Sequence, residues 1–246
     1  MDEATADLMI SWYQNLENQL LDFLNYVPYH QQNINVFSPK LATIITESCG
    51  LMDSILKYKT PNPINMSDRK NIKKRNLNID HYAELYGEKL ANYKAILLLS
   101  PVQYIQPYSN WLISGITYSN PSPPSLTWWK AHTDIKHDRI DNLELANLNN
   151  ALYSLCGLFI VIVDNPHLFI KAIHRAGWLH FHYTVEYVYE WALNGYPIRS
   201  NGISAVIKTS LFGLPLGVTI PEDINNFSPA FFQGGNVLIP YFGRHI

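Results

Sequence analysis

The stretch from Trp128 to Arg139 gathers side chains that could do chemistry into one short segment. It reads Trp-Trp-Lys-Ala-His-Thr-Asp-Ile-Lys-His-Asp-Arg, so imidazole, carboxylate and cationic groups alternate along it. A helix turns by about 100° per residue, so Lys130, Asp134 and His137 are expected on one face, which Asp141 would continue. The opposite face is apolar and is expected to pack against the protein; it comprises Trp128, Ala131 and Ile135.

The polar face of this helix would hold the groups that metal-independent phosphodiester cleavage requires. His137 titrates near neutrality and would act as general base or acid, taking the proton of a ribose 2′-hydroxyl. Asp134 would orient this imidazole, and a cation, Lys130 or Arg139, would stabilise the anionic phosphorane. The alternative is a surface ion pair between Lys130 and Asp134 at i,i+4, worth only about 0.2–0.5 kcal/mol.

Two further groups of side chains are candidates for binding RNA. His132, Lys136 and Arg139 form a line beside the aromatic face and would carry positive charge toward a ligand. The break at residues 60–78 is either a solvated loop or an arm that contacts phosphate. Its basic residues are Arg69, Lys70, Lys73, Lys74 and Arg75.

Metal and cofactor chemistry has little support in the sequence. His180 and His182 have no acidic or cysteine partner at a diagnostic spacing, so no metal site is predicted. Cys49 and Cys156 lie in apolar helical patterns and are expected to be small buried hydrophobic residues. Glycine-rich phosphate loops, nucleophile elbows and zinc-protease motifs are absent from the sequence, so no cofactor is expected.

Composition indicates a globular protein with a large apolar core. The 246 residues are 47% hydrophobic and only 15% charged, and the formal charge is −2. Because no global basic field exists, any nucleic-acid surface must be local. The N-terminus lacks a basic region followed by an apolar run, so a cytoplasmic protein is expected. The uncharged run from Leu145 to Val163 contains three Asn, so a buried helix is favoured over a membrane span.

Apolar spacing of three and four residues predicts long helices at 4–26, from Ser38 to 60, from Ser125 through the key stretch, and at 142–163. Asp80 is expected to cap a short helix, and Asp-Asn-Pro at 164–166 to end the apolar one. Residues 94–100 form a strand or a helical turn, and the run to Ser125 is expected to be loop. Strands are expected at 203–209 and 216–220.

These elements predict a mainly α protein. An antiparallel helical bundle would occupy residues 1–165, and a small aromatic-rich appendage containing β-structure would occupy residues 166–246.

Three adjoining segments resemble a known superfamily. They are Ser-Pro-Pro-Ser at 122–125, the key stretch, and Asn-Leu-Glu-Leu-Ala-Asn-Leu at 142–148. Together they resemble an uncharacterised bacterial branch of the HEPN (higher eukaryotes and prokaryotes nucleotide-binding) superfamily, over about residues 121–163. The resemblance implies a HEPN-like helical bundle that forms a homodimer. Its members occur in toxin–antitoxin, abortive-infection and CRISPR-linked systems, so RNA and an antitoxin or defence-system partner are implied.

Ribonuclease members of this superfamily carry an Arg followed, after four to six residues, by a His. Here Lys130 and not Arg precedes His137, with six residues between them, and Arg139 follows the His. Lys supplies charge without the bidentate phosphate contact of Arg. The literal pattern occurs elsewhere, at Arg75 to His81 and at Arg175 to His180.

Two main functions are therefore expected. The first is a HEPN-like protein that binds RNA or cleaves it without a metal, as a component of phage defence or as a toxin. The alternative is a non-catalytic dimerisation or protein-interaction module, in which Trp128, Trp129 and the aromatic C-terminal part form a dimer or partner surface and the ionisable face is structural. A third, lipid association through the apolar helix, is less favoured.

Overall fold

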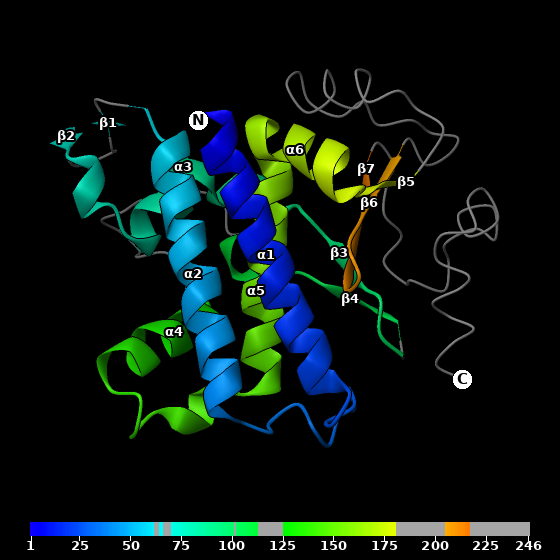
Figure 1. Cartoon of the computed structure of the whole chain (residues 1–246). Coiled ribbons are helices and arrows are strands. Elements are labelled where there is room, and N and C mark those ends of the chain that lie inside the picture. Colours follow the sequence, from blue (N-terminus) through cyan, green and yellow to red (C-terminus); the bar gives the residue numbers. More distant parts are fainter. Residues whose placement is uncertain (62–63, 66–69, 101, 113–124, 181–204, 217–246) are drawn as a thin grey trace. The chain divides into compact units, whose positions relative to one another are not determined.

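The computed structural model describes residues 1–61, 64–65, 70–100, 102–112, 125–180 and 205–216. Within these residues the chain is mainly helical with a small antiparallel sheet, which confirms the predicted fold class (Figure 1). The chain divides into two compact units. The helical unit comprises residues 13–93 and 106–161, and the sheet unit comprises residues 1–12, 94–105 and 162–246. The predicted division after residue 165 stays a prediction.

The helical unit contains most of the helices that apolar spacing indicates. Helix α1 (Glu3–Leu24) enters it at Tyr13, and α2 (Pro39–Lys59) runs in the opposite direction (Figure 1). The other helices are α3 (Ile79–Ala91), α4 (Thr127–His137) and α5 (Leu148–Asp164), with 3₁₀ turns η1 (Lys74–Asn76), η2 (Ser109–Trp111) and η3 (Leu143–Leu145). Strands β1 (Ile64–Asn65) and β2 (Lys70–Ile72) pair in antiparallel fashion.

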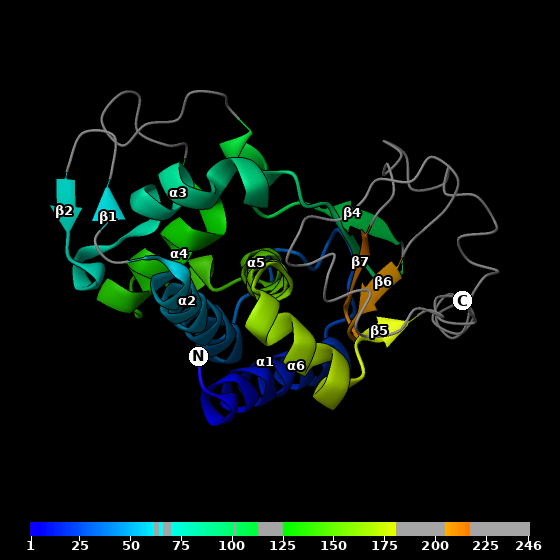
Figure 2. The ribbon, with the colours of Figure 1, turned by 90° about the horizontal axis from the view of Figure 1, so that it is seen from above.

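Helix α5 lies at the centre of the helical unit. Figure 2 views it nearly along its axis, with α2, α3 and α4 beside it. Nearly all its side chains up to Val161 are buried, as expected for a helix that is apolar on every side. The prediction of a buried core helix is confirmed. It begins at Leu148 and not at Asn142, because the Asn147 side chain accepts the N–H of Asn150 at 2.9 Å and caps the helix there.

Side-chain caps determine where α2 and α3 begin. Ser38 accepts the N–H of Leu41 at 3.2 Å and Pro39 occupies the first turn, as predicted. Helix α3 is capped by Asn78 and not by Asp80, which lies in the first turn. The Asn78 side chain accepts the N–H of His81, and the imidazole Nδ1 accepts the N–H of Asn78 in return.

The sheet unit contains a five-stranded antiparallel sheet. Its strands follow the order β4 (Gln103–Ile105), β3 (Ala95–Leu97), β7 (Phe212–Leu216), β6 (Ala205–Lys208) and β5 (Leu179–His180). The segment at 94–100 is therefore a strand, and β6 confirms the strand expected at 203–209. Strand β4 lies in a run that was expected to be loop. Strand β7 lies earlier than the predicted 216–220, of which residues 217–220 are outside the described part of the chain.

Helix α6 (Pro166–Ala176) follows α5 after a sharp turn. Asn165 accepts the N–H groups of His167 and Leu168, and Pro166 opens the helix, so Asp-Asn-Pro ends α5 as predicted. Gly177, with φ of +65°, ends α6 in the left-handed region that favours glycine. Among the described residues, no single helix is long and apolar enough to cross a membrane. Helices α5 and α6 pass that test of length and composition only as a pair, bent by 103°.

Candidate functional site

Helix α4 carries the key stretch and buries the face that was predicted to pack. Trp128, Ala131 and Ile135 are the buried residues of the helix. The helix starts one residue later than expected, because Leu126 and not Ser125 occupies the N-cap position, without a side-chain cap.

Trp128 anchors α4 in the core of the helical unit. Its indole Nε1 donates to the carbonyl of Pro107 at 2.9 Å, and its ring packs edge-on against Tyr108 at 5.6 Å between centroids. A β-carbon placed on Gly157 would lie 3.2 Å from the Trp128 ring, so this glycine permits the close approach of α5. The expectation that Trp128 belongs to a partner surface is therefore wrong, because the side chain is 2% exposed.

The polar face ends at His137, one turn earlier than the spacing suggested. Asp138 has extended backbone dihedrals, and its Oδ1 accepts the N–H groups of Ile140 and Asp141, both at 3.1 Å. The Asn142 amide donates to the carbonyls of Asp134 and Asp138. These local bonds satisfy the last turn of the helix, so Asp141 does not continue the face and the prediction for it is wrong.

The exposed face of α4 carries three of the four predicted catalytic residues, Lys130, Asp134 and His137, but only Lys130 and Asp134 are paired. Lys130 Nζ donates to Asp134 Oδ2 at 2.6 Å, and their side chains are 68% and 30% exposed. His137 and Arg139 are exposed to solvent, Arg139 in the turn beyond the helix. In the described part of the chain no hydrogen bond joins Asp134 to His137. The carboxylate is engaged with Lys130, and its role as the group that orients His137 remains a prediction.

His132 lies in a different environment from its neighbours on the expected basic line. The side chain is half-buried, its ring is 5.5 Å from that of Trp129, and its Nδ1 is buried without a hydrogen-bond partner in the described residues. Burial lowers the pKa of the His132 imidazole to about 4, and the Lys136 ammonium acts in the same direction while the Asp53 carboxylate opposes it. His132 is therefore neutral near pH 7, so of the predicted line only Lys136 and Arg139 carry charge, both of them exposed.

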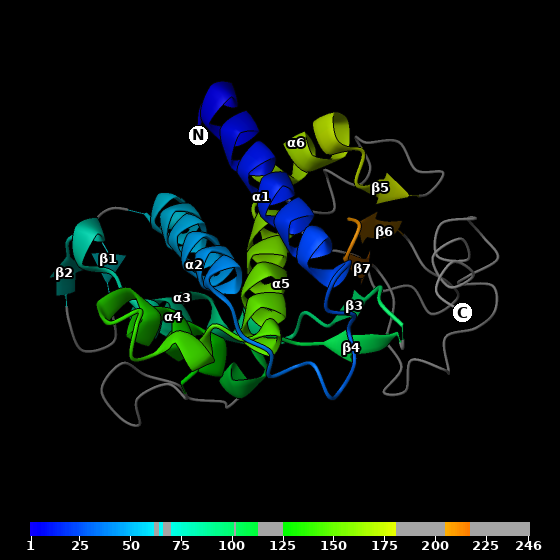
Figure 3. The ribbon, with the colours of Figure 1, turned by 60° about the horizontal axis from the view of Figure 1, so that its bottom comes forward.

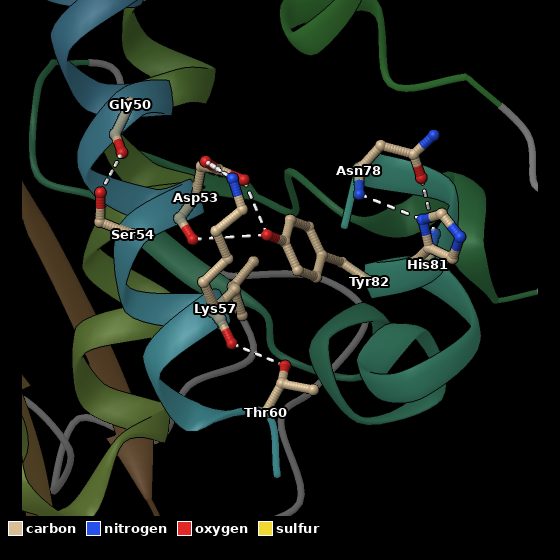
Figure 4. A network of polar contacts seen from close by, with 9 residues as sticks. Gly50, Asp53, Ser54, Lys57, Thr60, Asn78, His81 and Tyr82 are labelled. Atoms are coloured by element: carbon tan, nitrogen blue, oxygen red, sulfur yellow. Dashed lines mark hydrogen bonds and ion pairs between the residues drawn. The ribbon is translucent and has the colours of Figure 1, made fainter. Parts of the chain in front are cut away.

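A polar network between α2 and α3 was not foreseen from the sequence (Figure 4). Asp53 accepts from Lys57 Nζ at 2.7 Å and from the Tyr82 hydroxyl, also at 2.7 Å. Burial, and secondarily the bond to Asp53, raise the pKa of the Tyr82 phenol above its usual value. The i,i+4 spacing of Asp53 and Lys57 signals their pairing, whereas the partner on α3 is set only by packing.

The basic stretch and the literal Arg-to-His patterns have mixed surroundings. Lys73 and Arg75 are exposed and Lys74 is half-buried around η1. Arg69 lies outside the described residues, and the side chain of Lys70 is likewise outside them. His81 is buried and forms part of the α3 cap, so it does not present an exposed imidazole beside Arg75.

The second literal pattern belongs to the sheet unit. Arg175 lies 3.3 Å from the carboxylate of Asp7, and Lys171 contacts Glu3 at 3.0 Å. These are surface ion pairs between α6 and the start of α1, and such pairs contribute little to stability. The His180 side chain lies outside the described residues.

A cavity of about 210 Å³ lies between the first turn of α3 and the exposed face of α4. Lys130 and Asp134 line one side of it, and Asp80 lines another. Trp111 and Trp129 are the aromatic residues that line the cavity, and Thr133 is a further polar residue of the lining. The cavity thus holds two carboxylates and one ammonium group beside two indole rings.

Three exposed apolar side chains lie in the connections at the end of the helical unit where α4 finishes. The backbone of residues 34–38 bonds to that of 146–149, for example Leu148 N–H to the carbonyl of Val36 at 3.0 Å. Figures 1 and 3 show the α1–α2 and α4–α5 connections at this same end. Tyr26, Phe37 and Ile140 are 87%, 52% and 87% exposed there.

The described residues contain neither an exposed cysteine nor a group of side chains arranged to hold a metal ion. Cys49 and Cys156 are free thiols buried in helices, as predicted, and burial raises the pKa of both well above the usual value. Within the ranges that the structure describes, no group of three or more His, Cys, Asp or Glu side chains is arranged to hold a metal ion.

Comparison of the chain with protein-family models, with curated proteins and with solved structures finds no match. The chemistry of the site therefore has to be inferred from its own geometry. That geometry offers exposed cations and an accessible imidazole at one end of α4, and an aromatic cavity with carboxylates along its side.

Proposed function

We propose that this chain is a HEPN-like RNA-binding protein that contacts single-stranded RNA with the exposed C-terminal end of α4. The observation that supports this proposal best is the exposure of Lys136, His137 and Arg139. Within the described part of the chain, no acidic side chain forms an ion pair with any of the three. Exposed cations without acidic partners are available to neutralise phosphate.

The charge pattern around these residues predicts modest affinity. Asp138 and Asp141 alternate with the cations, so the surface as a whole is not strongly basic. If Lys136 and Arg139 each contact one phosphate, log K should fall against log salt with a slope of about −1.4, from about 0.7 per contact on a single strand. The cations around η1 would add to this slope if the same RNA reaches them.

We further propose that the same surface cleaves RNA. One copy supplies an imidazole and cations, while the carboxylate of Asp134 is held by Lys130. In a two-fold dimer, His137 and Arg139 of one copy would face those of the second, so that general acid and base come from different subunits. A role in phage defence or as a toxin follows from the resemblance to the superfamily.

The test of binding compares two variants with equal changes of charge. Lys136→Glu/Arg139→Glu should weaken binding to a labelled single-stranded RNA and flatten its salt dependence, measured by fluorescence anisotropy. Lys40→Glu/Lys89→Glu alters helix surfaces elsewhere in the helical unit and should leave binding unchanged. Equal loss in both variants would indicate a nonspecific effect of net charge and would contradict the proposed site.

The test of cleavage uses RNA degradation in the presence of a chelator. His137→Ala should abolish cleavage and leave the thermal melt nearly unchanged, because the imidazole is exposed. Undiminished cleavage by this variant would remove His137 from the mechanism.

A second candidate function, a protein-interaction module, is favoured by the exposed Tyr26, Phe37 and Ile140. Large exposed apolar side chains in neighbouring connections would serve an interface between copies or with a partner. Phe37→Glu/Ile140→Glu would then shift the chain to the monomer in sedimentation experiments. If RNA binding persists in this monomer, the two functions are separate.

A further inference from the structure

We infer that the cavity between α3 and α4 takes one unpaired guanine base of the bound RNA. The inference rests on the proposed function, because it names the base that the RNA would present beside the α4 surface. Its volume of about 210 Å³ is below the roughly 300–1,000 Å³ of pockets for drug-sized ligands. The space therefore suits a single planar group and not a whole nucleotide.

The electrostatics of the cavity exclude phosphate as the occupant of its interior. Asp80 and Asp134 carry two negative charges against the single positive charge of Lys130. Phosphate would be repelled there, whereas a neutral group rich in N–H donors would be attracted. In sequence, the cations of the basic stretch lie just before the α3 residues that line the cavity, since η1 ends at Asn76 and the lining begins at Ile79. The RNA phosphates would thus be contacted by the cations, and the RNA base by the side chains that line the cavity.

The arrangement of donors and acceptors selects guanine among the four bases. Its Watson–Crick edge presents two adjacent donors, N1–H and the N2 amino group, next to the O6 acceptor. The Asp80 carboxylate can accept both donors at once, and the ammonium of Lys130, which lines the same cavity, can donate to O6. Uracil offers one donor between two acceptors, and adenine and cytosine each lack the adjacent pair of donors.

The required groups are present and have bonding capacity left. The Asp80 carboxylate is half-buried in the first turn of α3, and no side-chain bond to it occurs among the described contacts. Asp134 uses Oδ2 for Lys130, which leaves Oδ1. Trp129 is half-buried and offers an aromatic surface against which a base can stack, while Trp111, which is 2% exposed, backs the cavity.

The experiment measures base preference with the full chain. A short uridine oligonucleotide is compared with oligonucleotides of the same length that carry one guanosine, adenosine or cytidine. The guanosine version should bind about tenfold more tightly than the all-uridine one. Asp80→Asn should abolish this preference and leave binding of the all-uridine RNA unchanged, while the matched control Glu88→Gln on the surface of α3 should retain it.

A second measurement separates this inference from the proposed function. Guanosine alone should shift the indole NMR signal of Trp129, assigned with Trp129→Phe, and uridine should not. Guanosine should do so even in Lys136→Glu/Arg139→Glu, in which the RNA surface is removed. RNA binding without preference among the bases, and without a guanosine shift, would overturn the inference and leave the proposed function standing. Displacement of guanosine by a tighter-binding arginine peptide would overturn it in favour of a protein side chain as occupant.

Discussion

Acidification should destabilise this protein through His132, because the folded chain resists protonation of the imidazole. The ordinary pKa of 6.5 falls to about 4 in the folded state, chiefly through burial. The charged groups that act on the ring are Lys136 on its own helix and Asp53 on α2, and Asp53 is itself bound to Lys57 and Tyr82. Since the folded pKa is depressed, the unfolded chain binds the proton first as the pH falls.

The sign and the size of the effect follow from this difference. The stability associated with neutral His132 is fully present above about pH 6.5 and is lost progressively as the pH falls through about 4. The full pKa difference corresponds to about 3.4 kcal/mol. Because the side chain is only half-buried, solvent screening reduces the expected loss to about 1–2 kcal/mol.

Urea unfolding at neutral pH and near pH 4 measures this loss when variants are compared. His132→Gln removes the imidazole and should make the free energy of unfolding less dependent on pH by about 1–2 kcal/mol than in the unaltered chain. His137→Gln, at an exposed position, should behave like the unaltered chain. An identical pH dependence in His132→Gln and the unaltered chain would refute the reasoning, and so would a gain of stability on acidification.

Three further substitutions test contacts within the helical unit. Gly157→Ala would place a β-carbon 3.2 Å from both the buried Trp128 ring and the Tyr108 hydroxyl, so it should lower the free energy of unfolding by about 1–3 kcal/mol in urea titration, and an unchanged midpoint would contradict the close approach. Tyr82→Phe removes the hydroxyl bond to Asp53 and should cost about 1–2 kcal/mol, measured as a lowered melting temperature; an unchanged melt would show that the bond contributes nothing. Asn142→Ala frees the last carbonyls of α4 and should speed amide exchange in its final turn, whereas α5 should keep its protection.

Local signals in the sequence were sufficient for the start of α2 and for the buried face of α4. Ser38 and Pro39 begin α2 because a cap and a first-turn proline act within a few residues of one another. The alternation of buried and exposed positions on α4 follows from the helical period alone. The early end at Asp138 also has a local cause, since an Asp that accepts the N–H groups two and three residues further on competes with the helix.

Long-range pairing explains what the sequence did not predict. Strand β7 contains Pro215, a residue usually absent from strand interiors, and its partners lie about ten residues before it and more than one hundred before it. Likewise, the charge of His132 depends on burial against α2, far away in sequence. The cavity beside Lys130 is formed by the first turn of α3, by Trp111 of η2 and by α4 together, so no spacing within one helix could indicate it.

Ultraviolet cross-linking of single-stranded RNA to the full chain, followed by mass spectrometry of the linked peptides, tests the central claim most directly. Cross-links should concentrate on the peptide that contains Lys136 to Arg139 and should disappear in Lys136→Glu/Arg139→Glu. Cross-links confined to other surfaces, such as that of Lys171 and Arg175 on α6, would contradict the assignment of the RNA-binding surface to the end of α4.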